Sequence, residues 1–301
     1  MTPLYTMDHA ADEPVHPRVL IHQFDGAMDA GHAGALAVEQ LLMTLPVERF
    51  VTFDADSLVD YRARRPVMTF ENWSYKEAST PELVIDLLHD DDGEPLLLLH
   101  GAEPDYRWEE FTSAVTHLVR TLGVEQVVGM TGAPLAVPHT RPTHVLQHGA
   151  QPERLPAQPD FFGRMELPAS IGTFLEMRLG ESGVESRGVT ASIPHYLARD
   201  DFPQGAAALI GAAAGVTGLA LPVGDLEAAA AANRAEIDAE TAGQAEVGAV
   251  VAALETQYDS VVPGRANIGS ADDIPSADEI GARLEAFLEA NDTQDFGRGE
   301  L

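Results

Sequence analysis

The segment spanning residues 96–108, with the sequence LLLLHGAEPDYRW, restricts the possible folds more than any other part of this chain. Its first residues form an unbroken apolar run, which needs cover on both faces, as in the central strand of an α/β sheet. The run stops at Gly101, and a polar turn leads from there into a helix. Ligands usually bind just past the carboxyl ends of such strands, and the residues that the turn places there are His100, Glu103, Asp105 and Arg107.

Strands and helices alternate around this segment. We predict strands at residues 18–24, 48–53, 82–88, 94–100, 124–130, 143–148 and 188–193, and helices at residues 32–44, 108–122, 171–179 and 203–219. The turn HDDDGEP joins two of these strands as an antiparallel hairpin. Residues 68–73 are expected to form a short extended piece, with Lys76 in a loop. The pattern predicts a three-layer α/β/α sandwich around a mixed, mostly parallel sheet.

The chain is expected to have four parts. Residues 1–15 are predicted to be a flexible lead-in, residues 16–222 the sandwich domain, residues 223–290 a helical C-terminal extension and residues 291–301 a disordered tail. Within the extension, residues 225–258 are predicted to be helical with a break near Gly243. A capping box of Ser276 and Glu279 begins a last helix over residues 276–290.

The charge and composition exclude several classes of partner. The chain has 48 acidic and 18 basic residues, which argues against nucleic acid and anionic membranes, because both attract Lys and Arg. The excess of acidic residues suits an acidic or salty proteome, and a surface directed at a basic partner is the alternative.

The sequence also bears on localisation. There is no cysteine, the N-terminus lacks the features of a secretory signal, and no apolar run is long enough to cross a bilayer. We therefore expect a cytoplasmic protein.

Polar turns at the predicted strand ends carry one set of residue types. If the turns meet at one rim of the sheet, arginines there could grip a carboxylate or phosphate, and a histidine or carboxylate could act as general acid or base. The candidate ligand-binding residues are Arg62, Arg65, Arg107, His139, Arg141 and His195, and the candidate acid–base residues are Asp25, Asp29, Glu103 and His139. Taken singly, each more often serves turn geometry or a local ion pair.

Other recognised site patterns are missing. The turn FDGAMDAG after the first strand is similar to a phosphate-binding loop, but neither G-x-G-x-x-G nor a Walker pattern is present, and we expect no cofactor. His139, His144 and His148 lack an acidic ligand at a recognised spacing, so we expect no metal site. Ser192 precedes Pro194 and His195 without the G-x-S-x-G elbow of a serine hydrolase.

Five motifs, taken in order, resemble a known family. FDGAMDAG, DYRARRP, LLLHGAEPDYRWEEF, GMTGAPLAVPHTRP and ASIPHYL are similar to the actinobacterial branch of the proteasome assembly chaperone type-two family. The likeness covers residues 18 to about 219. It implies a sandwich similar to that of purine nucleoside phosphorylases and self-association into homo-oligomers. Eukaryotic relatives pair with another subunit and help to assemble proteasome α-rings, which implies proteasome-related subunits as partners.

Two hypotheses about function follow. The first is a non-catalytic binding or assembly protein that engages a protein partner, supported by the resemblance, the missing catalytic motifs and the helical extension. The second is a hydrolase or phosphorylase-type enzyme acting on a small anionic or nucleoside-like ligand at the rim. The geometry of the rim discriminates between them, because side chains that converge on an enclosed pocket favour an enzyme. Side chains that pair off and hold loops in place favour assembly.

Overall fold

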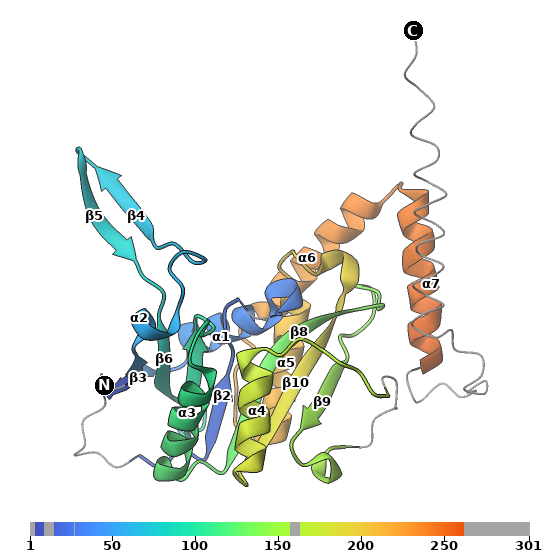
Figure 1. Cartoon of the computed structure of the whole chain (residues 1–301). Helices are drawn as coiled ribbons and strands as arrows, with labels where there is room; N and C mark the ends of the chain where they lie inside the picture. The colour runs from blue at the N-terminus through green and yellow to red at the C-terminus, as the bar shows by residue number, and fades with distance from the viewer. Residues whose placement is uncertain (1–3, 9–14, 27, 157–162, 262–301) are drawn as a thin grey trace. The chain divides into compact units, whose positions relative to one another are not determined.

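The computed structural model describes residues 4–8, 15–26, 28–156 and 163–261. Met1–Leu254 forms one compact unit and Glu255–Leu301 a second. The first unit contains an eight-stranded sheet with the order β1-β3-β6-β7-β2-β8-β10-β9 (Figure 1). The strands are β1 (Tyr5–Met7), β2 (Val19–His22), β3 (Val47–Phe53), β6 (Leu83–His89), β7 (Pro95–Gly101), β8 (Gln126–Leu135), β9 (Val145–Gly149) and β10 (Glu185–Pro194).

The sheet is parallel at its centre and antiparallel on both flanks. Strands β7, β2, β8 and β10 pair in parallel, and β3 points the same way because two antiparallel pairings separate it from β7. The edge strands β1 and β9 pair antiparallel with β3 and β10. This arrangement confirms the predicted mixed, mostly parallel sheet, including the hairpin of β6 and β7.

Helices cover both faces of the sheet. The helices are α1 (Ala33–Thr44), α2 (Ala55–Leu58), α3 (Trp108–Leu122), α4 (Ile171–Glu181), α5 (Pro203–Thr217), α6 (Leu226–Thr241) and α7 (Ala245–Val261), with short 3₁₀ turns at Ala30–His32, Pro152–Arg154 and His195–Leu197. Helices α1 and α5 bury their apolar residues on one face of the sheet, and α3 and α4 bury theirs on the other. Two separate apolar clusters result, which is the predicted three-layer sandwich.

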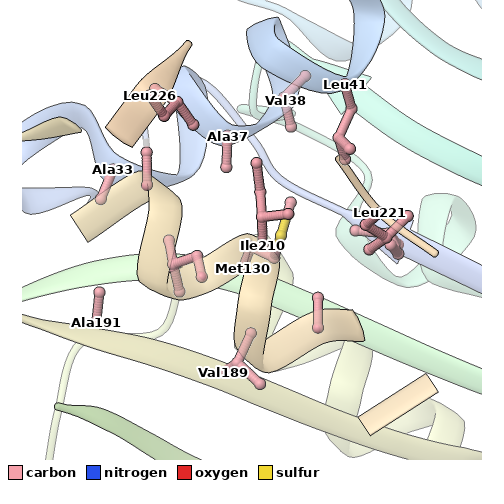
Figure 2. Packing of buried hydrophobic residues seen from close by; sticks show 14 of the residues in the cluster. Ala33, Ala37, Val38, Leu41, Met130, Val189, Ala191, Ile210, Leu221 and Leu226 are labelled. Atoms are coloured by element: carbon pink, nitrogen blue, oxygen red, sulfur yellow. The ribbon is translucent and has the colours of Figure 1, made fainter. Parts of the chain in front are cut away.

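Small residues let α1 and α5 pack closely on their face. Ala33, Ala37 and Leu41 of α1 are fully buried, and Ala206 and Ile210 of α5 belong to the same apolar cluster. Figure 2 shows Ile210 beside Ala37. Helix α6 packs on α5 and contributes the buried side chains of Leu226 and Ile237 to the same apolar cluster. Because alanine side chains are short, the two helices approach each other closely, and the dispersion attraction between them is strong.

A second sheet of two strands stands apart from the core. Strands β4 (Val67–Glu71) and β5 (Ser74–Ser79) pair antiparallel across the two-residue turn Asn72-Trp73. Both turn residues have positive φ, 49° and 59°, as a hairpin of the primed type requires. Figure 1 shows this hairpin, which we call the arm, extending from the sandwich. Lys76 therefore lies in a strand, whereas we expected it in a loop.

The structure differs from the sequence-based boundaries at both ends. Tyr5–Met7, in the expected flexible lead-in, forms the edge strand β1, and its Tyr5 ring lies 5.8 Å from that of Phe53. The compact unit continues past residue 222 to Leu254, because α6 contributes buried residues to the core. The predicted break near Gly243 separates α6 from α7. The predictions for residues 276–290 and 291–301 lie outside the described residues.

Two substitutions on α1 test the packing of the core. Leu41 is fully buried, so Leu41→Ala should lower the free energy of unfolding by about 2–5 kcal/mol through lost contacts and a cavity. Met43 is 72% exposed on the same helix, so Met43→Ala should change it by less than about 0.5 kcal/mol. Guanidinium denaturation measures both values, and similar losses in the two variants would contradict this packing.

Candidate functional site

The turns that follow β2, β7, β8 and β10 lie at the same edge of the sheet, which we call the carboxyl rim. The turns after β2 and β7 are joined directly, since the amide of Asp25 donates to Gly101 O at 2.8 Å and that of Glu103 donates to Asp25 O at 2.9 Å. The turn after β2 also bonds the start of α5, where Phe202 N donates to Gly31 O. The rim is therefore one continuous edge, built from turns far apart in the sequence.

Asp29 is held by backbone groups of α1 and β8. Its carboxylate accepts hydrogen bonds from the amides of Gly34 and Ala35, at 2.9 and 3.0 Å, and from that of Gly132 at 2.8 Å. The first amides of a helix form the position that binds phosphate in nucleotide-binding loops. Here the protein's own carboxylate fills that position. Asp29 thus fixes the start of α1 against β8, and the similarity of FDGAMDAG to a phosphate loop ends there.

Glu103 and Asp105 also serve neighbouring turns. Glu103 Oε1 accepts the amide of Ile171 at 2.8 Å, which caps the start of α4. Asp105 accepts the amide of Asp60 at 2.7 Å and pairs with Arg64 at 3.4 Å. Arg64 in addition donates to the backbone oxygen of Glu103. These contacts attach the base of the arm and the start of α4 to the turn after β7.

His139 lies in a different part of the rim. It is 2% exposed, its Nδ1 lies 2.7 Å from the Tyr196 hydroxyl, and its Nε2 lies 3.1 Å from Asp238 Oδ1 on α6. Because Asp238 can only accept when ionised, Nε2 carries the proton and Nδ1 accepts from the hydroxyl. This network ties α6 to the turns after β8 and β10. His195, which is exposed, contacts Tyr196 edge-to-face.

The predicted arginines do not gather in one place. Arg107 starts α3 with a φ of 59° and pairs with Glu110 at 2.6 Å. Arg141 has its backbone oxygen bonded by Gln204 at 2.8 Å, beside the His139 network. Arg62 and Arg65 are exposed near the base of the arm, and within the described residues their guanidinium groups form no ion pair. The rim thus holds separate local groups of paired side chains instead of one anion-binding pocket.

No group of three or more potential metal ligands occurs in the described part of the chain. His148 pairs with Glu176 of α4 at 3.0 Å, and the backbone oxygen of His144 accepts the amide of Ser192. A groove of about 380 Å³ lies between α3 and α4 and is lined by polar residues such as Thr112, His117 and Arg178. None of the predicted site residues lines it.

Sequence reasoning missed a buried ion network beside Asp25. Asp86 of β6 is 3% exposed and accepts from Arg49 Nε at 2.6 Å and from His100 Nε2 at 2.8 Å. Burial alone would raise the pKa of Asp86, but the hydrogen bonds from His100 and Arg49 outweigh it and lower the pKa. A lone acid inside the apolar strand LVIDLLH was the available signal, because buried carboxylates need partners.

His22 and His148 face each other across two glycines. The strand registers set His22 beside Gly129, Gly129 beside Gly188, and Gly188 beside His148. Each imidazole leans over its neighbouring glycine, where a Cβ atom would come within 2.6 Å of His22 and 2.0 Å of His148. Both glycines are therefore required by close packing. His22 is 5% exposed and its Nε2 is buried without a hydrogen-bond partner among the described residues.

The fold and the rim together define a mixed α/β/α sandwich protein with locally paired side chains at its carboxyl edge. The model of the PAC2 family matches residues 23–241, and the chain belongs to this family. This confirms the resemblance seen in the five sequence motifs. Among curated proteins there is no match.

None of the described helices is long and apolar enough to cross a membrane.

Several solved structures are similar to this chain. The unknown function protein Rv2714 of Mycobacterium tuberculosis is 39% identical with a TM-score of 0.79, and the alignment covers 86% of this chain and 92% of that one. A protein of unknown function from Corynebacterium glutamicum is 35% identical, also with a TM-score of 0.79, covering 85% and 97%. The proteasome-assembly chaperone homologue Rv2125 of M. tuberculosis is 26% identical with a TM-score of 0.68, covering 75% and 96%.

The buried imidazole of His22 predicts a pH-dependent stability. Desolvation, with a smaller contribution from His148, lowers the pKa of His22 from 6.5 to about 4. The unfolded chain therefore binds this proton more readily, so the stabilisation is complete above pH 6.5 and is lost as the pH falls towards 4. Across this window, wild type should lose roughly 2–3 kcal/mol more unfolding free energy than His22→Gln.

Urea denaturation at several pH values measures this difference. The variant His195→Gln, which removes an exposed imidazole, should keep the wild-type dependence. If His22→Gln loses stability with the same slope as wild type, the buried imidazole is not the group responsible.

Proposed function

We propose that this protein is a non-catalytic, assembly-chaperone-like protein that forms homo-oligomers and engages proteasome-related subunits in the cytoplasm. The observation that carries the proposal is the tip of the arm. Trp73 adopts a left-handed conformation that favours glycine, and its side chain is nevertheless 94% exposed. A bulky residue in this conformation is strained, and an exposed indole at the tip buries no apolar area within the chain, so its presence there supports a role in recognition.

The arm carries further apolar side chains that the sandwich does not cover. Val67, Met68, Phe70 and Tyr75 are all more than half exposed. The Phe70 ring packs against Tyr75 at 5.1 Å and against Trp73 at 6.5 Å, so the three rings form one aromatic cluster. Contiguous exposed apolar patches mark protein-interaction sites, and aromatic residues dominate the binding energy at such sites.

The pairing of side chains at the carboxyl rim supports the same proposal. Of the four candidate acid–base residues, Asp29 and Glu103 accept hydrogen bonds at helix starts, and His139 bridges Tyr196 and Asp238. Groups used in this way hold loops in place and are not available to transfer protons to a substrate. Asp25 receives a side-chain hydrogen bond from Gln23 and is close enough to His100 for their charges to interact.

The partner follows from relatives and from charge. One similar structure, 26% identical to this chain, is described as a proteasome-assembly chaperone homologue. The arm bears Glu71, Lys76 and Glu77, with Arg62 and Arg65 at its base, so it is close to neutral within a chain of net charge −30. Weak like-charge repulsion at the arm favours contacts there, both with a second copy and with another subunit.

Two substitutions in the arm test self-association. Phe70→Ser combined with Trp73→Gly removes two rings, and the Asn-Gly turn that results is preferred in primed hairpins, so the arm should stay folded. We expect wild type to form a homo-oligomer. The dissociation constant for self-association should be about tenfold higher or more in the variant than in wild type. Light scattering after gel filtration measures the mass, with the exposed-methionine double variant Met43→Ser/Met177→Ser as control. An unchanged oligomer in the arm variant would contradict this role.

Binding to proteasome subunits needs a separate experiment. Purified α and β subunits of the 20S proteasome from the same organism should bind the wild-type chain, and α-subunit ring formation should accelerate when it is present. The arm variant should lose this effect, whereas the methionine control should retain it. Surface plasmon resonance measures binding, and native mass spectrometry follows the rings. Absence of binding to every subunit by wild type would reject the proteasome as its partner.

A further inference from the structure

Each strand of the arm has one free edge. Strands β4 and β5 pair with each other and, within the described residues, with no third strand. The N–H and C=O groups of a strand alternate between its two sides, so half of those in each strand point away from the hairpin. A two-stranded hairpin is only marginally stable in water, and a further strand at one edge would stabilise it. The arm is therefore suited to receive a strand.

The two edges of the arm differ in how they resist such pairing. Thr69 of β4 faces Glu77 of β5. The next residue of β4, Phe70, faces Tyr75, so Lys76 is an extra residue in β5 and forms a bulge. A bulge and a lysine are two features with which proteins block an edge strand. Strand β4 has neither, because its five residues, VMTFE, follow one another without an insertion. The outer edge of β4 is therefore the unprotected one.

The side chains of β4 are exposed and mostly apolar. Val67, Met68 and Phe70 are 76%, 51% and 56% exposed, and an exposed apolar edge strand is the kind that pairs with another strand. Glu71 is the charged residue of β4, and Arg65 lies just before the strand. Both are exposed, and within the described residues neither forms an ion pair. Their charges can therefore be neutralised by a partner.

We propose that β4 pairs antiparallel with β4 of a second copy, so that two arms form one four-stranded sheet around a two-fold axis at Thr69. This inference rests on the proposed role of the arm in self-association and specifies how the two copies meet. In this register Met68 faces Phe70 of the second copy, and Val67 faces its Glu71. All five residues of each strand are paired, and the interface is self-complementary, as a two-fold axis requires.

The sequence around β4 suits this register. The Met68 thioether meets the Phe70 ring of the second copy, and threonine meets threonine at the axis, which are both favourable contacts. Arg65 precedes a proline, so it favours extended backbone and continues the line of the strand. It is then the diagonal neighbour of Glu71 in the second copy, within reach of a long side chain. A second copy thus supplies the strand, its apolar side chains and the opposite charges.

A cysteine introduced at the axis tests the pairing in the full chain. The chain contains no cysteine, and residues that face each other across antiparallel strands have Cα atoms at disulfide distance. Thr69→Cys should therefore form a disulfide-linked dimer with oxidised glutathione about tenfold faster or more than Glu77→Cys. Glu77 faces Thr69 within one arm but belongs to β5, which makes Glu77→Cys a matched control. Non-reducing gel electrophoresis measures both rates.

Charge reversal tests the register. Arg65→Glu and Glu71→Arg each place like charges at the contact between copies, so each variant alone should self-associate about tenfold more weakly than wild type. An equal mixture of the two forms a heterodimer with opposite charges at both symmetric contacts, which should restore the dissociation constant to within about twofold of wild type. Lys76→Glu and Glu77→Arg make the same changes of net charge on β5 and should leave self-association unchanged. Analytical ultracentrifugation measures the dissociation constants.

Two results would overturn the pairing of β4 with β4. They are equal rates of disulfide formation in the two cysteine variants, and no recovery when the two charge variants are mixed. The arm variant Phe70→Ser/Trp73→Gly tests the proposed function separately. If that variant dissociates and either of these results is found, the arm mediates self-association through other contacts or another partner strand. A wild-type chain that stays monomeric would contradict both the pairing and the proposed self-association.

Discussion

The structure depends on the need to cover both faces of a nearly continuous apolar sheet. Leu96–Leu99 of β7 and Leu20 and Ile21 of β2 are fully buried, which is possible only if helices lie above and below them. Helix α1 covers one face and α3 the other, and the chain must then diverge where β2 and β7 end. The carboxyl rim is a consequence of this burial.

Carboxylates at the rim stabilise the starts of helices. Asp29 binds the first amides of α1, and Glu103 binds the first amide of α4. The amides at a helix start lack intrahelical partners and carry partial positive charge, so an acid there satisfies them and fixes the entry of the chain. Polar residues at a sheet rim can in this way serve the architecture of the fold, so their presence there does not by itself indicate catalysis.

The arm and the carboxyl rim differ in how their side chains are covered. The arm exposes rings on a short hairpin, which suits a macromolecular partner that can bury them. Because the arm begins beyond Arg64, whose guanidinium contacts Asp105 and Glu103, the base of the arm is attached to the turn after β7 in the carboxyl rim.

The sequence by itself determined the sandwich, the central strands, the hairpin of β6 and β7, the helix α3 and the family. Each of these follows from local periodicity, turn chemistry or ordered motifs, which act over a few residues. It did not reveal β1, which lies in a short acidic stretch, or the arm's second strand, because neither has a buried face to produce a periodic pattern. It also named Arg62 and Arg65 for the rim, whereas Arg64 makes the contacts there.

Only the tertiary structure decided which polar groups are paired. Asp25 and Asp29 have the same side chain four residues apart, yet Asp29 receives three amide hydrogen bonds and Asp25 remains without an ion pair among the described residues. The role of Asp86 in orienting His100 likewise depends on the register of β6 against β7. The bond from Gly132 to Asp29 joins residues 103 positions apart, and that between His100 and Asp86 joins residues 14 apart. No local pattern specifies them, because they arise only when the sheet has brought its strands together.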